Sequence, residues 1–294
     1  MSNRKVTPSG ARPAPRGQAA KKYNRLKKTL SKMKRVLVAF SGGVDSTLLL
    51  KTAADILGEG VLAVIAASET YPRREIREAE RLADKLGVRR RTIHTRELKN
   101  PAFTRNETDR CYHCKKELFS RLNGVAKAES IPYVLDGQNE DDRSDYRPGS
   151  RAARELGVRS PLQEAGLTKA EIRLISRRLG LPVWNKPSLA CLASRFPYGE
   201  SIGGKGLAQV GTAEEFLLGL GLIQVRVRSH GRNARIEVDS KDIGRLAQPA
   251  LRARIVRRLK ALGFLYVALD LQGYRSGSLN EGLKRSRQRT SLQR

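Results

Sequence analysis

Short apolar runs alternate with longer amphipathic segments through the first half of the chain. Three runs are apolar and partly β-branched, as strands covered on both faces would be: residues 35–40, 61–65 and 131–136. Apolar residues at helical spacing lie between them, most clearly at residues 72–86 and 111–128. Because strands separated by helices are joined by right-handed crossovers, this pattern predicts an α/β fold with a parallel sheet.

The pattern changes in the last third of the chain. Gly, Pro and Ser interrupt residues 180–206, and an irregular passage of that length is more often functional than idle. The predicted elements that follow are a short helix at 212–219, strands at 223–228 and 234–238, a long helix at 240–262 and a strand at 266–270. We therefore expect a second, smaller α+β domain with antiparallel pairing.

These patterns divide the chain into four expected segments. The two folded ones are an α/β domain over residues 35–205 and an α+β domain over 206–283. Residues 1–34 are expected to be a basic, disordered arm with room for one short helix, and residues 284–294 a basic tail.

A glycine turn follows the first predicted strand directly. The string at residues 41–46 reads Ser-Gly-Gly-Val-Asp-Ser and runs into a helical segment. Paired glycines let the backbone approach a ligand closely, and the helix that starts there directs free N–H groups at the same point. The turn is therefore expected to bind an anion, most plausibly phosphate. It lacks the spacing and the lysine of a Walker loop, which disfavours kinase-type phosphoryl transfer.

The glycine turn resembles the PP-loop of the N-type ATP pyrophosphatases, the adenine nucleotide alpha hydrolase-like fold. On that resemblance Ser41, Gly42, Gly43 and Ser46 would hold the β,γ-pyrophosphate of ATP while the α-phosphate goes to the substrate as AMP. Asp45 would position the loop or a Mg²⁺ ion. The alternative is an ordinary strand-to-helix turn with a Ser or Asp cap.

An acidic loop follows the strand at 131–136. It holds five acids within ten residues, beginning at Asp136. Carboxylates combined with phosphate oxygens are the ligands that Mg²⁺ prefers, and this loop lies at the carboxyl end of a strand, where ligands of such sheets bind. A solvated, turn-forming loop is the alternative.

Three cysteines, without an export signal, argue against a disulfide framework. Cys111 and Cys114 share one face of a predicted helix start, and Cys191 lies in the irregular passage. The residues alone leave three interpretations open: thiol or persulfide chemistry, a structural or zinc site completed by His113 or Cys191, and an iron–sulfur cluster with one open iron.

The two ends of the chain hold much of its positive charge. The formal net charge is +29; residues 1–35 carry twelve Lys and Arg and no acid, and residues 284–294 carry five more. Solvated extensions and nucleic-acid-contacting arms are the two interpretations. No run approaches the roughly 18 apolar residues of a membrane span. We expect a cytoplasmic protein with no membrane partner.

Several stretches read together resemble the LarE family: the glycine turn and residues 136–149, 187–199, 226–237 and 273–281. The resemblance covers nearly all of residues 34–281. It implies a sulfur transferase in synthesis of the nickel-pincer nucleotide cofactor of lactate racemase. ATP would adenylate a carboxylate of pyridinium-3,5-biscarboxylic acid mononucleotide, and sulfur from the protein would displace AMP to leave a thiocarboxylate.

The resemblance also implies how the sulfur arrives. Single-cysteine members sacrifice the thiol that matches Cys191 and end with dehydroalanine there. This chain carries Cys111 and Cys114 as well, so it resembles the three-cysteine members, in which a 4Fe-4S cluster binds the transferable sulfide on its fourth iron. We therefore expect Cys191 and Asp45 to be catalytic, a 4Fe-4S cluster on the three cysteines, and sulfide or another sulfur donor as a partner.

The remaining expected ligands are those of substrate and magnesium. Arginines on the strands of the second domain are expected to bind the phosphate or carboxylates of a small-molecule nucleotide, with one weaker candidate outside them: Arg226, Arg228, Arg235 and Arg195. Solvent-facing arginines are the alternative for each. Magnesium is expected at Asp45 or Asp136, with Glu237 as a further candidate, and we expect a homo-oligomer.

Two other functions compete with this hypothesis. Some PP-loop tRNA thiolases also use three cysteines and a cluster, and a charge of +29 suits RNA. A non-catalytic nucleic-acid-binding protein with this fold is the second alternative, which the complete glycine turn opposes. Nucleic acid remains an expected partner only through the basic ends.

Overall fold

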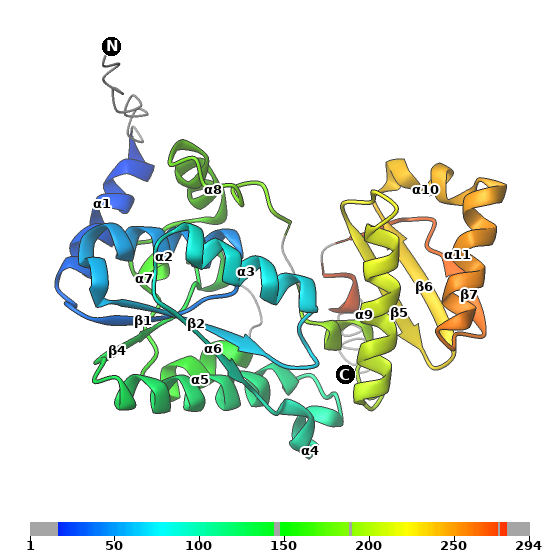
Figure 1. Cartoon of the computed structure of the whole chain (residues 1–294), viewed down its shortest axis with the longest axis horizontal. Helices are drawn as coiled ribbons and strands as arrows, with labels where there is room; N and C mark the ends of the chain where they lie inside the picture. Colours follow the sequence, from blue (N-terminus) through cyan, green and yellow to red (C-terminus); the bar gives the residue numbers. More distant parts are fainter. Residues whose placement is uncertain (1–16, 144–147, 188–189, 276, 281–294) are drawn as a thin grey trace, which may run out of the picture. The chain divides into compact units, whose positions relative to one another are not determined.

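The structure is a computed structural model that describes residues 17–143, 148–187, 190–275 and 277–280 (Figure 1). The chain divides into two compact units, each built from separate stretches. The first unit comprises residues 1–66, 74–93 and 118–188, and the second comprises residues 67–73, 94–117 and 189–294. The expected tail, and the first 16 residues of the expected arm, lie outside the described residues.

This division differs from the expected boundary between residues 205 and 206. The passage from residue 189 onward belongs to the second unit, because Leu192, Phe196 and Ile202 are buried in that unit's hydrophobic core. The sequence did not reveal this boundary, since the apolar residues of the passage follow no periodic pattern.

The first unit is built on a four-stranded parallel sheet, as predicted. Its strands are β1 (Val36–Ala39), β2 (Val61–Ala67), β3 (Arg90–His94) and β4 (Tyr133–Leu135), in the order β3-β2-β1-β4. Val36 pairs with Val61 on one side and with Tyr133 on the other. The strand order therefore reverses at β1, and a ligand crevice is expected at the carboxyl end of that strand.

Helices cover both faces of this sheet, with α2 and α3 on one side and α5 and α6 on the other (Figure 1). The helical elements of the unit are α1 (Gln18–Ser31), α2 (Val44–Leu57), η1 (Gly58–Gly60), α3 (Arg73–Lys85), η3 (Glu140–Arg143), α6 (Pro148–Glu155), α7 (Pro161–Glu164) and α8 (Lys169–Arg178), together with most of α5 (Arg110–Ala128). Residues 110–117 of α5 belong to the second unit. Successive strand residues such as Leu37 and Val38 are fully buried on opposite faces. This explains the continuous apolar runs that predicted the strands.

Helix α1 is part of the first core. Tyr23, Leu26 and Leu30 are buried, and the two leucines are 0% exposed. The apolar face is thin, but it packs against α2 and α7. Residues 18–31 of the expected arm are therefore folded, and their basic residues occupy the outer face of a helix.

The second unit contains a three-stranded sheet, β5 (Val225–His230), β6 (Asn233–Val238) and β7 (Tyr266–Leu269), in the order β5-β6-β7. β5 and β6 form the predicted antiparallel pair, while β7 lies parallel to β6 because two helices carry the chain back between them. The helical elements are η2 (Glu97–Lys99), α4 (Pro101–Thr104), η4 (Leu192–Arg195), α9 (Gly204–Leu218), α10 (Ser240–Ala247), α11 (Pro249–Ala261) and η5 (Ser278–Asn280).

The predicted boundaries of two helices in this unit were wrong. The single helix expected over 240–262 is divided at Gln248, because Pro249 has no N–H for the preceding turn and instead begins α11. Helix α9 begins at Gly204, eight residues before the predicted start, since its tertiary contacts outweigh the poor helix propensity of its glycines. No helix among the described residues is long and apolar enough to cross a membrane.

The turn between β1 and α2 requires glycine at position 42. Gly42 has φ of +68°, and a Cβ there would lie 3.0 Å from Ala79 Cβ. We expect Gly42→Ala to lower the free energy of unfolding by about 1–3 kcal/mol, because both the backbone and the packing are strained. Gly124→Ala is the matched control: Gly124 lies within α5 with nothing near its Cβ position, so this change should stabilise by up to about 1 kcal/mol.

Urea unfolding of the two variants and the parent measures the difference. Equal stability of Gly42→Ala and the parent would contradict the strained geometry of the turn.

Candidate active site

The glycine turn and its serines form a closed hydrogen-bond network in the first unit. The hydroxyls of Ser41 and Ser46 lie 3.1 Å apart, and Ser46 Oγ also donates to the carbonyl of Gly43 at 3.2 Å. Gly43 N donates to Ser41 Oγ at 3.4 Å. These groups come together at the start of α2, where the helix dipole favours an anion. The predicted pyrophosphate-binding residues are thus assembled in one place.

The acidic loop after β4 approaches this turn closely. A Cβ on Gly137 would lie 3.1 Å from the backbone nitrogen of Ser46, a tight contact that favours glycine there. Both oxygens of Asp136 are hydrogen-bonded: Ser160 Oγ donates to Oδ1 at 2.7 Å, and Gln138 Nε2 donates to Oδ2 at 2.6 Å. Asp136 therefore shapes the loop, and its oxygens are already engaged without magnesium.

Asp45 faces Lys169, a residue that the sequence analysis missed. Lys169 Nζ forms an ion pair with Asp45 Oδ2, while Asp45 Oδ1 is buried and has no hydrogen-bond partner. Burial raises the pKa of Asp45, and the attraction of Lys169 opposes that rise. An ionised carboxylate with one open, buried oxygen fits a divalent cation. Of the magnesium candidates in this unit, Asp45 is the one with an available oxygen.

The signal for Lys169 was present in its neighbours. Thr168 and Glu171 form the predicted capping box, which makes Lys169 the first residue of α8. Lys169 N also donates to Asp141 Oδ2 at 2.9 Å. The start of α8 is thereby fixed between the acidic loop and the glycine turn, a contact between distant segments that sequence spacing does not reveal.

All three cysteines belong to the second unit. Cys111 and Cys114 lie near the start of α5, and Cys191 is the N-cap residue of η4. Cys111 is exposed, and the other two thiols are half-buried. Burial raises the pKa of Cys114 well above its usual value, and the charge of the Cys191 thiolate adds to that shift.

A buried carboxylate and a phenol surround Cys114. Cys114 Sγ donates to Glu97 Oε1 at 3.8 Å, and Thr95 Oγ1 donates to the same oxygen at 2.8 Å. Glu97 is 1% exposed, and its Oε2 has no partner. Burial raises the pKa of Tyr71 well above its usual value, and the charges of Cys114 and Glu97 add to this. These groups were not identified from sequence, since nothing in their spacing links them to the cysteines.

The three cysteines are free thiols in the structure. No group of three His, Cys, Asp or Glu side chains in the described part of the chain is arranged around one metal-ion position.

A buried ion pair holds the segment that carries Cys191. Arg195 is 1% exposed and makes two hydrogen bonds of 2.7 Å to the carboxylate of Glu214. Arg195 Nη1 also donates to the carbonyls of Ala190 at 2.9 Å and Cys191 at 3.1 Å. Glu214 Oε1 in turn accepts from Val227 N at 2.9 Å. One guanidinium thus connects the Cys191 turn to α9 and β5.

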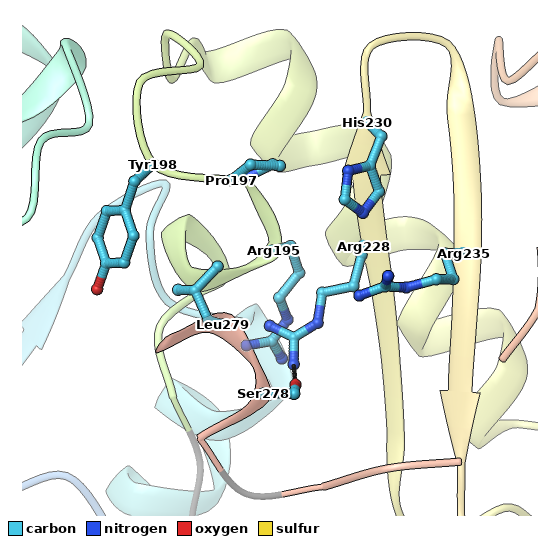
Figure 2. A pocket seen from close by; sticks show the side chains of 8 residues that line it. All are labelled: Arg195, Pro197, Tyr198, Arg228, His230, Arg235, Ser278 and Leu279. Atoms are coloured by element: carbon cyan, nitrogen blue, oxygen red, sulfur yellow. Dashed lines mark hydrogen bonds between the residues drawn. The ribbon is translucent and has the colours of Figure 1, made fainter. Parts of the chain in front are cut away.

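Arg195 also lines a pocket of about 330 Å³ in the second unit, shown in Figure 2. The pocket is lined by three arginines, a histidine and four smaller or aromatic residues: Arg195, Arg228, Arg235, His230, Pro197, Tyr198, Ser278 and Leu279. Arg228 makes hydrogen bonds of 3.0 and 2.8 Å to Glu237, and its Nη2 donates to Ser278 Oγ at 3.1 Å. Arg235 Nη2 donates to the same Glu237 at 3.1 Å.

Guanidinium N–H groups in this pocket can donate to an anion. Three arginines and no acidic residue line it, although Glu214, Glu237 and Asp270 each form an ion pair with one of these arginines. His230 adds no positive charge at neutral pH, because burial, followed by repulsion from Arg235, lowers its pKa. Its Nε2 is buried without a partner and is available to a ligand.

The predicted substrate-binding arginines therefore separate into two groups. Arg195, Arg228 and Arg235 line the pocket, whereas Arg226 is absent from its lining residues and lies with its guanidinium 5.3 Å from the centre of the Tyr274 ring. Glu237 is a magnesium candidate, but both of its carboxylate oxygens accept hydrogen bonds from Arg228, and Oε1 also accepts one from Arg235. Its two oxygens are therefore already engaged by arginine side chains.

The β1 strand, the glycine turn with its serines and the parallel sheet define the first unit as a PP-loop ATP-pyrophosphatase domain. Residues 19–128 match the NAD synthase family. The chain is 46% identical over 262 residues to an uncharacterised protein of Synechocystis sp., with coverage of 89% of this chain and 98% of that protein. An uncharacterised protein of Methanocaldococcus jannaschii is 28% identical over 259 residues, covering 87% and 98%.

The relationship that identifies the family is with pyridinium-3,5-bisthiocarboxylic acid mononucleotide synthase of Lactiplantibacillus plantarum. The two chains are 43% identical over 258 residues, covering 87% of this chain and 93% of that enzyme. The chain belongs to this family, the LarE family, and is an ATP-using sulfur transferase.

Breaking the buried Arg195–Glu214 pair is expected to lower the stability of this unit strongly. Arg195→Gln leaves Glu214 charged and buried without its partner, so the free energy of unfolding should fall by about 3–5 kcal/mol. Arg235→Gln is the matched control, because Arg235 is 41% exposed and Glu237 keeps Arg228; its loss should stay within about 1 kcal/mol. Urea unfolding compares them, and similar losses in both variants would contradict the assigned role of Arg195.

Proposed function

We propose that this protein converts a carboxylate of pyridinium-3,5-biscarboxylic acid mononucleotide into a thiocarboxylate in two steps, adenylation by ATP and sulfur transfer. The proposal rests on one observation: a thiol and a wall of the arginine pocket belong to the same short segment. Cys191 and Arg195 lie at the two ends of one turn, and Arg195 lines the pocket. The similarity to the pyridinium-3,5-bisthiocarboxylic acid mononucleotide synthase of Lactiplantibacillus plantarum supports the choice of substrate.

In the first step a substrate carboxylate oxygen attacks the α-phosphate of ATP and pyrophosphate leaves. The Ser41–Ser46 hydroxyl pair and the backbone N–H groups at the start of α2 would bind pyrophosphate in place of their present internal hydrogen bonds. The charge of Lys169 favours the ionised form of Asp45, and the free Oδ1 of Asp45 would hold Mg²⁺, which neutralises phosphate charge when bound.

Substrate binding rests on the arginine pocket of the second unit. The mononucleotide carries a phosphate and two carboxylates, and the residues that line the pocket include three arginines and no acidic residue. Arg235 is the most exposed of the three arginines and would make a charge-assisted hydrogen bond to one of these anionic groups. The unpartnered Nε2 of His230 supplies a second polar contact.

In the second step sulfur attacks the carbonyl carbon of the acyl adenylate, and AMP leaves with the former carboxylate oxygen. Adenylation is needed because a free carboxylate would have to expel oxide. A 4Fe-4S cluster on Cys111, Cys114 and Cys191 would supply an open iron for exogenous sulfide. In the alternative route Cys191 gives its own sulfur and becomes dehydroalanine.

The products of ATP test the first step. Cleavage between the α and β phosphates predicts AMP and pyrophosphate in equal amounts, whereas ADP as the main product would exclude this use of the glycine turn. Asp45→Asn should slow adenylation by about ten- to hundredfold, because it removes a charge-assisted contact worth about 1.5–3 kcal/mol. Lys51→Gln, at an exposed ion pair on the outer part of the same helix, is the control and should keep the parent rate.

The fate of the cysteines tests the second step. If sulfur arrives through a cluster, replacing any one of Cys111, Cys114 and Cys191 by alanine should remove bound iron, acid-labile sulfide and repeated turnover together. The intact chain should keep its mass after turnover. One turnover per chain, a mass loss of about 34 Da at Cys191 as its sulfur leaves in the thiocarboxylate product, and a fully active Cys111→Ala variant would contradict the cluster and support sacrifice of Cys191.

A further inference from the structure

The outer face of α1 carries a stripe of cations that the sulfur-transfer chemistry does not use. Lys21, Arg25, Lys28 and Lys32 follow one another at intervals of four, three and four residues, which places them on one side of the helix and its C-terminal cap. All four are exposed. At 1.5 Å per residue the stripe is about 16 Å long.

Three of these cations line a pocket of about 330 Å³ in the first unit. Arg25, Lys28 and Lys32 contribute to its wall together with Tyr133 and Arg159. The guanidinium of Arg159 lies 5.9 Å from the centre of the Tyr133 ring, so the pocket combines cations with stacked planar groups.

The charge of the stripe is uncompensated. Among the described residues, the side chains of Arg25, Lys28 and Lys32 make no ion pair or hydrogen bond. Their neighbours differ: Lys22 pairs with Glu171 at 2.8 Å, and Arg159 makes two hydrogen bonds to Glu164. Helix α1 itself contains no acidic residue. Three neighbouring like charges repel one another, and an anionic ligand would relieve this repulsion.

The pocket and the expected ATP site lie at opposite ends of the strands of the parallel sheet. Met33, which precedes β1, and Tyr133, which begins β4, both line it, so it lies at the amino ends of these parallel strands. The glycine turn follows the carboxyl end of β1. A ligand in the pocket would therefore occupy a separate site from ATP.

We propose that the α1 stripe and its pocket bind single-stranded nucleic acid. The linear array of unpaired cations fits a chain of phosphodiesters, and the Tyr133–Arg159 pair offers a surface on which an unpaired base stacks. A duplex keeps its bases stacked inside and cannot place one in a pocket. The inference is independent of the sulfur-transfer reaction and concerns a partner rather than a substrate.

The test measures binding of a fluorescent oligouridylate of about 20 nucleotides to the full chain by anisotropy over a range of salt concentrations. The variant Arg25→Gln/Lys28→Gln/Lys32→Gln should bind about tenfold or more weakly at low salt. The slope of log K against log salt should become shallower by about 2, because each lost phosphate contact removes about 0.7.

A matched variant controls for net charge. Arg252→Gln/Arg257→Gln/Lys260→Gln removes the same three charges from exposed positions of α11, and it should bind at least threefold more tightly than the α1 variant. Both variants should keep the urea midpoint of the parent. Equal weakening by the two variants, duplex RNA bound as tightly as the single strand, or no binding by the parent at low salt would each overturn the proposal.

Discussion

The buried pair of Arg195 and Glu214 is the interaction on which the second unit depends. Burying two charges is favourable only when both are fully hydrogen-bonded, and here the guanidinium donates to two carboxylate oxygens and to the carbonyls of Ala190 and Cys191. The same carboxylate accepts from the backbone of β5. The position of the Cys191 turn, the wall of the anion pocket and the contact between α9 and the sheet therefore rest on one pair of side chains.

Buried charge is used differently in the first unit. Asp45 has one oxygen paired with Lys169 and one oxygen buried without a partner. An incompletely satisfied carboxylate costs stability, and it is retained where a ligand completes it. The second unit shows the same contrast between two glutamates. Glu237 accepts hydrogen bonds from two arginines, whereas Glu97 contacts Cys114 through Oε1 and has no partner for Oε2. Saturated groups fix the scaffold, and open groups mark positions where chemistry is expected.

Local chemistry made part of this structure predictable. The glycine turn, its strand and its helix were read correctly because Gly42 is required by a backbone angle and a close contact, both set within a few residues. Lys169 and Glu214 were not found, because each meets its partner across long separations in sequence that only the fold brings together. The division of the helix at Pro249 illustrates a different error. The helical spacing of apolar residues on both sides of Pro249 predicted one continuous helix, although proline lacks the N–H that such a helix needs at this position. The helical spacing of α1 was visible, but its burial depended on contacts with α2 and α7.

The central claim is that a carboxylate is activated as its adenylate before sulfur replaces one of its oxygens. The most direct test supplies pyridinium-3,5-biscarboxylic acid mononucleotide labelled with ¹⁸O in its carboxylates, together with ATP, Mg²⁺ and sulfide, and measures AMP and the nucleotide product by mass spectrometry. The account predicts one ¹⁸O atom in each AMP formed and one sulfur in place of one oxygen in the product. Unlabelled AMP, or labelled AMP without sulfur in the nucleotide, would contradict it.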